Sequence, residues 1–282
     1  MRIAGAPISW GVCEVPGWGY QLPADRVLRE MREVGLTATE FGPDGFLPTD
    51  EILRDLGLSA IGGFVPVILH DPGHEPAVDF ERFVAAGADT VVLAAATGQD
   101  GYDSRPVLDA RGWQSLLTNL DKLAAAARER GLRAVLHPHV GTMVEQTAEV
   151  ERVLDGCGIG LCLDTGHLLI GGTDPVVLAQ RAGDRIAHVH AKDVDDSVAA
   201  EVRAGRLGYT EAVGAGMYKP IGDGDVDFAA VAAALQRHDY DGWWVLEQDT
   251  ILTGEPAGEG PIADVRLSAG RLREILAAQA KR

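Results

Sequence analysis

Short apolar runs alternate with amphipathic segments along the whole chain, and this alternation limits most strongly what the chain can fold into. The runs are rich in Val, Leu, Ile and Ala, and the segments between them place apolar residues at helical spacing. Gly35, Gly87 and Gly131 each follow a helical segment, where glycine is a favoured terminator. Regular strand–helix alternation is typical of α/β folds with a parallel sheet.

The pattern predicts eight strands and eight helices. Strands are expected at 2–10, 37–41, 58–64, 90–96, 133–137, 159–164, 186–190 and 243–247. Helices are expected at 24–34, 48–56, 77–86, 111–130, about 145–154, 175–181, 228–238 and about 262–278. The stretch at about 194–217 is longer than an ordinary strand-to-helix loop and carries one short helical pattern near 197–204. We expect an insertion there that acts as a flap over the site, or alternatively as an oligomer contact.

Eight strand–helix units in 282 residues fit a (β/α)8 TIM barrel, although a doubly wound open sheet shares the same alternation. Two observations favour the barrel. No strand is followed by a GxGxxG or GxxxxGK[ST] phosphate loop. Polar residues end strands one, two and five to eight, whereas an open sheet gathers its ligands near one switch point. We therefore predict one TIM-barrel domain over residues 1–282.

The charge and composition restrict the partners that the chain can have. A formal net charge of −17 argues against nucleic acid or an anionic membrane surface. No apolar run approaches the roughly 18 residues that cross a bilayer, and MRIAGAPISW lacks the features of a secretory signal. Three cysteines form neither a disulfide framework nor a zinc motif. We expect a cytoplasmic protein that binds a small molecule, and a homo-oligomer remains possible.

The last four predicted strands all end in ionisable residues. These are His137 and His139, Asp164 and His167, His190 with Lys192 and Asp193, and Glu247 with Asp249. In a barrel these four strand ends are neighbours around one rim, at the end where ligands bind. One such residue alone is more often a cap, but four successive strand ends favour a metal site. Mixed imidazoles and carboxylates suit Mn²⁺, Co²⁺, Fe²⁺ or Zn²⁺ better than Ca²⁺.

Several motifs carry a resemblance to a known family. The runs APISWG, LDTGH, HVHAKD and GDGDVDF, together with a last strand that ends in Glu247, resemble the xylose-isomerase-like sugar isomerase/epimerase superfamily. Within it, HPHVGTMVE at 137–145 and MYKPIGDGDVDF at 217–228 resemble the inosose (2-keto-myo-inositol) dehydratase branch. The resemblance extends over essentially the whole chain.

The resemblance implies a TIM barrel with one divalent metal, usually held by Glu, Asp, His and Glu from strands five to eight. The matching positions here are His137, Asp164, His190 and Glu247. His137 departs from the superfamily's Glu but agrees with the dehydratase branch. The fourth ligand therefore stays open between His137, water and Glu145. Mn²⁺ or Co²⁺ is the expected ion, with Zn²⁺, Fe²⁺ or Mg²⁺ as alternatives, because the missing carboxylate disfavours Mg²⁺.

The reactions of such a family share one first step, which is removal of a proton next to a ketone. A metal stabilises the resulting enediolate, and a base must reach the proton. Candidate bases are His139, His167 and Glu145, with Glu40 on the facing wall, and candidate acids are His167 and Lys192. Of these we favour His139 or Glu145 as the base and His167 as the acid. We expect substrate contacts from Trp10, Trp18, Glu40 and Lys219. The plainer interpretations are packing for the two tryptophans and a loop cap for Glu40. For the candidate acid Lys192, the plainer interpretation is an ion pair with Asp193.

The favoured hypothesis is a metal-dependent dehydratase that acts on a keto-inositol. The alternative is an isomerase or epimerase of an inosose or keto-sugar with the same metal site. A metal-dependent endonuclease of abasic sites shares the barrel, but it needs more ligands and a basic groove, which a charge of −17 disfavours. A non-catalytic polyol-binding protein is a fourth hypothesis, which metal-dependent proton exchange on a substrate would exclude.

Overall fold

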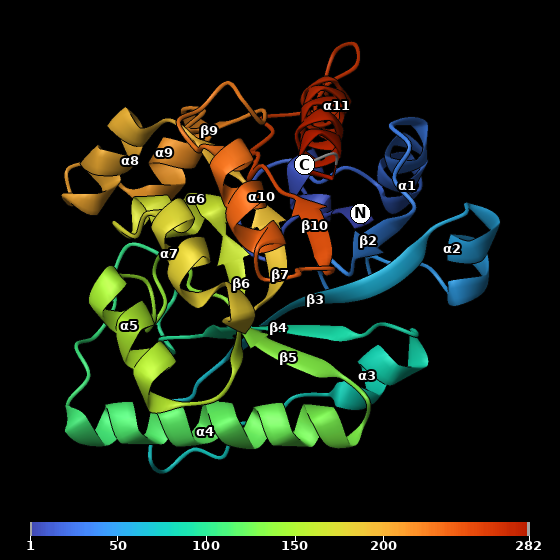
Figure 1. Cartoon of the computed structure of the whole chain (residues 1–282). Helices are drawn as coiled ribbons and strands as arrows, with labels where there is room; N and C mark the ends of the chain where they lie inside the picture. Colours follow the sequence, from blue (N-terminus) through green and yellow to red (C-terminus); the bar gives the residue numbers. More distant parts are fainter. Residues whose placement is uncertain (1, 281–282) are drawn as a thin grey trace.

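A closed barrel of parallel strands forms the centre of the computed structural model, which describes residues 2–280 (Figure 1). The strand order around the barrel is β1–β10–β7–β6–β5–β4–β3–β2, and each neighbouring pair is parallel. The barrel strands are β1 (Arg2–Gly5), β2 (Ala38–Glu40), β3 (Ser59–Val67), β4 (Thr90–Ala95), β5 (Arg133–Leu136), β6 (Gly160–Asp164), β7 (Ile186–Ala191) and β10 (Trp243–Leu246). This arrangement confirms the predicted (β/α)8 TIM barrel.

Helices follow the strands and cover the outside of the barrel. They are α1 (Ala24–Glu33), α2 (Asp50–Asp55), α3 (Phe80–Ala85), α4 (Ala110–Glu129), α5 (Thr147–Gly156), α7 (Pro175–Ala182), α10 (Phe228–Gln236) and α11 (Ile262–Gln279). Several begin where an aspartate accepts a hydrogen bond from a first-turn amide, as Asp109, Asp174 and Asp227 do. These local signals explain why the predicted helices lie within a few residues of the observed ones.

The core has two parts. Inside the barrel the apolar side chains are small or β-branched, including Ala4, Ala38, Ile61, Val92 and Val245. Larger apolar residues pack between the outer face of the strands and the helices. A barrel interior filled in this way is a packed core and not a pore, so the site must lie above it at one rim.

Two differences from the prediction occur at strand ends. The first strand ends at Gly5 instead of residue 10, because a 3-10 helix over Pro7–Trp10 follows, and proline cannot donate to a strand ladder. A short helix that was not predicted, α6 (Thr165–Ile170), begins directly at the end of β6. Asp164 caps it, because Oδ1 accepts a hydrogen bond from the amide of His167 at 2.7 Å.

The insertion holds more structure than the sequence predicted. Two short antiparallel strands, β8 (Asp193–Val194) and β9 (Tyr218–Lys219), form its base. Between them lie α8 (Asp196–Arg203), which is the predicted helix, and α9 (Tyr209–Gly214), which was not predicted. α8 packs against α6 and α9 packs against α8, on one side of the barrel (Figure 1). Asp193 accepts hydrogen bonds from the amides of Gly222, Gly224 and Val226, and so fixes the following loop.

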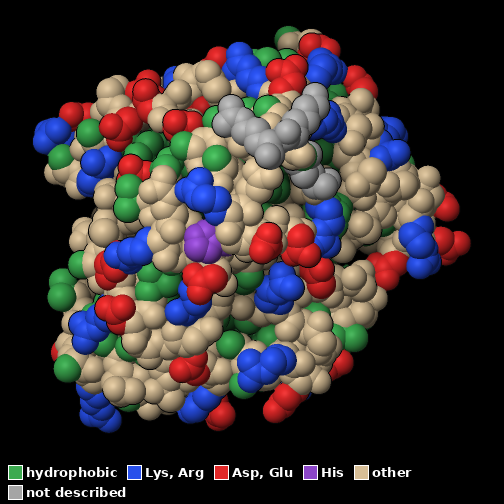
Figure 2. Space-filling model, viewed as in Figure 1, with side chains coloured by type: hydrophobic (Ala, Val, Ile, Leu, Met, Phe, Trp, Pro, Cys, Tyr) green, Lys and Arg blue, Asp and Glu red, His purple; other side chains and the backbone are tan. Residues whose placement is uncertain are grey.

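Acidic and basic side chains are interspersed over the face shown in Figure 2, with no continuous basic area on it. Within residues 2–280, none of the helices has the length and apolarity needed to cross a membrane.

Candidate active site

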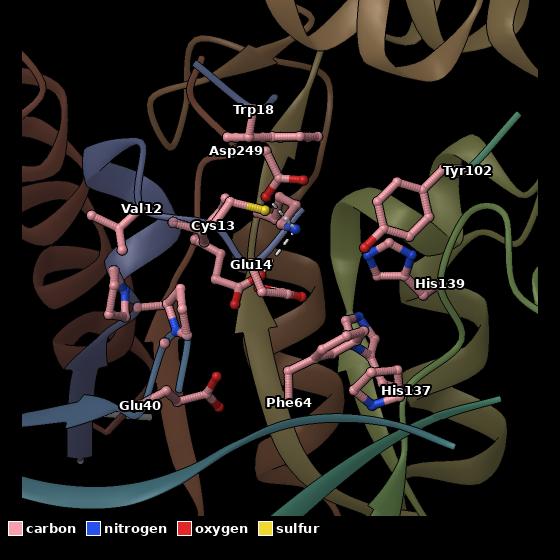
Figure 3. Close-up of a pocket in the computed structure, with 18 of the residues that line it drawn as sticks. Val12, Cys13, Glu14, Trp18, Glu40, Phe64, Tyr102, His137, His139 and Asp249 are labelled. Atoms are coloured by element: carbon pink, nitrogen blue, oxygen red, sulfur yellow. Dashed lines mark ion pairs between the residues drawn. The ribbon is translucent and has the colours of Figure 1, made fainter. Parts of the chain in front are cut away.

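A cavity opens at the carboxyl-end rim of the barrel, where the polar strand ends were predicted to meet (Figure 3). Its wall combines ionisable groups with aromatic and apolar side chains. Those that bear on the chemistry are Glu14, Trp18, Glu40, Asp44, Phe64, Tyr102, His137, His139, Lys192, Tyr209, Glu247 and Asp249. In Figure 3, Tyr102 and His139 lie together on one side of the cavity, and Glu40 lies on the other.

The four residues predicted as metal ligands lie together at this rim. Asp164 and His190 are direct neighbours in the register of β6 and β7. Asp164 Oδ2 is 3.3 Å from His137 Nε2 and 3.5 Å from His190 Nδ1. Glu247 Oε2 is 3.4 Å from His190 Nδ1. One ligand atom each from His137, Asp164 and His190 falls within 4.8 Å of the others, which is close enough for a shared ion.

The donor set of this cluster fits a divalent transition metal. Asp164 Oδ2, His190 Nδ1 and both ring nitrogens of His137 are buried and have no hydrogen-bond partner among the described residues. Buried polar atoms are rarely left without a partner, so such a group indicates a bound species. One carboxylate oxygen and two imidazole nitrogens, with a second carboxylate beside them, match the preferences of Mn²⁺, Co²⁺ or Zn²⁺.

The protonation states of His137 and Asp164 leave lone pairs free in the cluster. Burial lowers the pKa of His137 to about 4, so its imidazole is neutral near pH 7. Burial alone would raise the pKa of Asp164, but the charge of Lys192 and the neighbouring histidine rings hold that pKa well below its usual range. Asp164 is therefore a carboxylate. Its Oδ1 caps α6 and its Oδ2 faces the cluster.

Glu40 hydrogen-bonds to Nε2 of His190, the ring nitrogen on the side away from Asp164. Its Oε1 accepts from His190 Nε2 at 3.0 Å and from His188 Nε2 at 2.8 Å. The Nε2 hydrogen of His190 is thereby engaged, so Nδ1 is the nitrogen that faces Asp164 and Glu247. A carboxylate that fixes the tautomer of a histidine ligand in this way is common at metal centres. His188 lies one layer deeper in the barrel and supports Glu40.

Lys192 is buried among three carboxylates. Its Nζ lies 2.9 Å from Glu247 Oε2, 2.8 Å from Asp249 Oδ1 and 3.5 Å from Asp164 Oδ2. Burial alone would lower the pKa of Lys192, but these acidic neighbours raise it well above its usual value. The group is therefore an ammonium, and it lines the cavity where a bound molecule would meet it.

His139 and His167 form a stacked pair, with ring centres 3.7 Å apart. Burial lowers the pKa of each well below the usual value, so both are neutral. His139 Nδ1 lies 2.6 Å from the carbonyl oxygen of Val140, which can only accept, so Nδ1 carries the hydrogen and Nε2 carries a lone pair. Gly141 has a φ of +74° and no side chain, so the backbone of Tyr102 can approach the HPHVGTMVE segment closely. The ring of Tyr102 then packs against the ring of His139.

Four predicted site residues lie elsewhere than expected. Trp10 is fully buried in the core, and its Nε1 donates to Glu30, so it does not line the cavity. Lys219 lies in β9, also outside the cavity wall. Glu145 turns away and accepts from the amide of Gly141, beside Arg105. His167 is buried outside the cavity wall, with its Nε2 3.1 Å from Lys192 Nζ and its ring against His139.

Among the other residues of the cavity wall, Trp18 was predicted from the sequence, whereas no role was predicted for Asp249, Tyr102 or Tyr209. Trp18 lies in the wall as expected, and its Nε1 donates to the carbonyl oxygen of Thr250. Asp249 had been noticed at a strand end but was given no role. Tyr102 and Tyr209 come from a long loop and from the insertion, where no periodic pattern signals which side chains point inward.

Comparisons with known proteins agree with this geometry. The family model described as xylose isomerase-like TIM barrel matches residues 20–274. An inosose dehydratase of Geobacillus kaustophilus is 34% identical over 268 residues, which cover 88% of this chain and 87% of that protein. The rhizopine catabolism protein MocC of Rhizobium meliloti is 32% identical over 296 residues, covering 99% and 89%. The zinc-bound structure of the IolI protein is similar in fold, with a TM-score of 0.69 at 12% identity and 99% of each chain covered.

Proposed function

The chain belongs to the xylose isomerase-like TIM barrel family, and from this premise and the rim geometry we propose that it is a metal-dependent dehydratase of a keto-inositol. It is an enzyme of the dehydratase or isomerase kind, because relatives at 34% and 30% identity are inosose dehydratases. The main support for the proposal is the convergence of His137, Asp164, His190 and Glu247 at the barrel rim, beside a cavity whose wall includes the Lys192 ammonium group.

We assign the metal to these four side chains. A divalent cation held there would polarise the substrate ketone and stabilise the negative charge of the enediolate. The mixed donor set supports Mn²⁺ or Co²⁺ as the physiological ion, with Zn²⁺ as the nearest alternative. Glu40 supports the assignment, because it engages Nε2 of His190 and so leaves Nδ1 as the nitrogen that faces Asp164 and Glu247.

His139 is the residue best placed to act as the base. Its Nε2 lone pair is fixed by the bond from Nδ1 to Val140, and the residue lines the cavity. A neutral imidazole can accept the proton next to the ketone without first losing one of its own. Glu145, the other base considered from the sequence, faces Arg105 and is no longer a candidate.

Lys192 is the residue best placed to act as the acid. Loss of water requires a proton for the departing hydroxyl oxygen, and Lys192 presents an ammonium group to the cavity. His167 supports Lys192 from behind, at 3.1 Å. An isomerase or epimerase with the same metal site has no leaving group to protonate, so the buried ammonium favours the dehydratase over that alternative.

The charge of the cavity supports a neutral substrate. Its carboxylates are Glu14, Glu40, Asp44, Glu247 and Asp249, whereas Lys192 is the one lysine, and no arginine lines the cavity among residues 2–280. Phosphorylated sugars are normally held by arginine or by backbone amides. Trp18 and Phe64 offer apolar surface to the C–H face of a cyclitol ring.

The test is to incubate the protein with 2-keto-myo-inositol, once loaded with Mn²⁺ and once stripped with EDTA. Ultraviolet absorbance and NMR would follow loss of water to an enolisable dione. We expect formation of the dione only in the loaded sample. A rearranged inosose without loss of water would support the isomerase instead. An equal rate in the stripped sample would contradict the metal assignment.

A further inference from the structure

The second helix of the insertion contributes a buried tyrosine to the cavity wall. Tyr209 is the first residue of α9 and is 1% exposed. Its hydroxyl donates to Asp249 Oδ2 at 2.6 Å and lies 3.0 Å from the hydroxyl of Tyr218. The insertion is therefore bonded directly to a residue that follows β10 and lies 40 residues further along the chain.

Asp249 connects this tyrosine to the ammonium group. Its other oxygen, Oδ1, lies 2.8 Å from Lys192 Nζ. Lys192 Nζ is also 2.9 Å from Glu247 Oε2, which belongs to the proposed metal cluster. The position of the ammonium therefore depends on both Asp249 and Glu247. The hydroxyl of Tyr209 orients Asp249 and so helps to fix where the ammonium lies.

The start of α9 is itself fixed to the barrel. Asp103, in the loop after β4, accepts a hydrogen bond from the amide of Tyr209 at 2.6 Å. The ring of Tyr102 packs edge-on against Tyr209, at 5.6 Å between centres, and against His139 at 5.0 Å. Tyr209 therefore lies in a defined position between the candidate base and the residues that hold the candidate acid.

We propose that Tyr209 is a positioning residue that directs the Lys192 ammonium toward the leaving hydroxyl, so that the insertion commits the enzyme to loss of water. This inference rests on the proposed dehydratase function. It assigns to the insertion a role in choosing between two outcomes of one enediolate, which can be protonated again on carbon or can expel its neighbouring hydroxyl.

The step that depends on Tyr209 is the second of two. In the first, the base takes the proton from the carbon next to the ketone, and the electron pair of that C–H bond forms the enediolate. In the second, the enediolate re-forms the carbonyl, a carbon–carbon double bond forms, and the C–O bond to the neighbouring hydroxyl breaks. One N–H proton of Lys192 passes to the departing oxygen, which leaves as water. The proton on the base returns to Lys192 through solvent, so the net change is loss of one water.

The test is the ratio of these two steps in Tyr209→Phe, measured by NMR on the Mn²⁺-loaded protein with 2-keto-myo-inositol in D₂O. Deuterium entering unreacted substrate reports the first step, and dione formation reports the second. We expect dione formation to fall by about tenfold or more, since general acids typically contribute at least a hundredfold. We expect deuterium exchange to stay within about twofold of the wild-type rate, because the base and the metal cluster are untouched.

Asp249→Asn is the second variant, and it should raise the ratio of exchange to dione formation in the same way. Tyr240→Phe is the matched control, because it also loses a 2.6 Å hydrogen bond from a tyrosine, to the carbonyl of Trp243, far from the rim. Calorimetric titration of each variant with Mn²⁺ should give the wild-type affinity.

Equal losses of exchange and of dione formation in Tyr209→Phe would overturn the inference, because they would indicate general disruption. Unchanged rates of both would overturn it as well. Wild-type protein that catalyses neither step would instead contradict the proposed function on which the inference rests.

Discussion

At the scale of single residues, the side chains of the rim share one arrangement, in which one polar atom is fixed by the protein and the other faces the cluster or cavity. Asp164 caps α6 with Oδ1 and presents Oδ2. His190 is held at Nε2 and presents Nδ1. His139 donates from Nδ1 and presents Nε2. Fixing one atom of each group orients the other before any ligand arrives, which reduces the entropy that binding must overcome.

Glu40→Gln tests this arrangement at His190. The substitution keeps the shape of the side chain but removes the charge that holds the two histidines by their Nε2 atoms. Loss of such a partner typically weakens metal affinity by about 10- to 100-fold. We expect a drop of that size in Mn²⁺ affinity, measured by isothermal titration calorimetry.

Asp44→Asn is the matched control for Glu40→Gln. Asp44 also lines the cavity and is also acidic, but it pairs with Arg82 and touches no histidine. Its Mn²⁺ affinity should stay within about twofold of the wild-type value, since an exposed charge is well screened. A Glu40→Gln variant that binds Mn²⁺ as tightly as this control would show that Glu40 does not orient the metal site.

Site residues could be predicted from the sequence where they stand at the end of a strand that the apolar pattern reveals. His137, Asp164, His190 and Glu247 end successive strands, and a parallel barrel brings such ends together. Trp10 was assigned wrongly, because the sequence cannot tell a tryptophan that packs in the core from one in a cavity wall. Glu145 was assigned wrongly, because Arg105, in a distant loop, attracts its carboxylate.

At the scale of elements, the short helix α6 decides where Lys192 can lie. Gly166, in its first turn, has no side chain, and a Cβ there would come within 2.8 Å of Lys192 Cγ and 3.1 Å of Tyr218 Cε1. The glycine of the LDTGH motif thus leaves the space through which the lysine reaches Glu247 and Asp249. This helix was missed in the sequence because it spans only six residues and its N-cap, Asp164, is also the last residue of β6.

Gly166→Ala should therefore displace Lys192. Overpacking of a core typically costs about 1–3 kcal/mol of stability, and a misplaced catalytic group can cost about 100-fold in rate. We expect the rate of dione formation to fall by about 100-fold. The free energy of unfolding, measured by denaturant titration, should fall by about 1–3 kcal/mol.

Gly270→Ala provides the comparison for Gly166→Ala. Gly270 lies inside α11, and a Cβ there would meet no atom within 4 Å. That substitution should stabilise the helix by about 0.5–1 kcal/mol and leave the rate unchanged. If Gly166→Ala behaves like Gly270→Ala, the position of Lys192 does not depend on α6.

The insertion shows the limit of prediction at this scale. Its first helix could be found from its apolar spacing, and the length of the segment indicated a structure above the rim. Its second helix carries the residue that enters the cavity, yet only six residues form it and none of its own side chains caps it. Asp103, about a hundred residues earlier, supplies the cap, and no local pattern could have predicted that contact.

At the scale of the whole molecule, the acidic balance and the proposed metal are related. The chain carries a formal charge of −17, and several of its buried carboxylates meet at one rim. Bringing Asp164, Glu247 and Asp249 together is unfavourable unless cations balance them. Lys192 supplies one such cation within the chain. A bound divalent ion would supply further positive charge and would stabilise the folded state.

Addition of Mn²⁺ should therefore raise the melting temperature. At a concentration about 100 times the Kd, binding contributes about 2.7 kcal/mol, which corresponds to a shift of roughly 5–10 °C for a chain of this size. Differential scanning calorimetry in Mn²⁺ and in EDTA measures the shift. Asp164→Asn, which retains the oxygen that caps α6, should abolish it. A shift that persists in this variant would place the stabilising ion elsewhere.

The most direct test of the account is to locate the ion. Crystals grown with Mn²⁺ would be measured at the manganese absorption edge, and the anomalous difference map would show its position. We expect one peak within bonding distance of His137, Asp164, His190 and Glu247, with Glu40 hydrogen-bonded to Nε2 of His190. A peak between Glu40 and His188, or no peak at the rim, would rule out the proposed metal site.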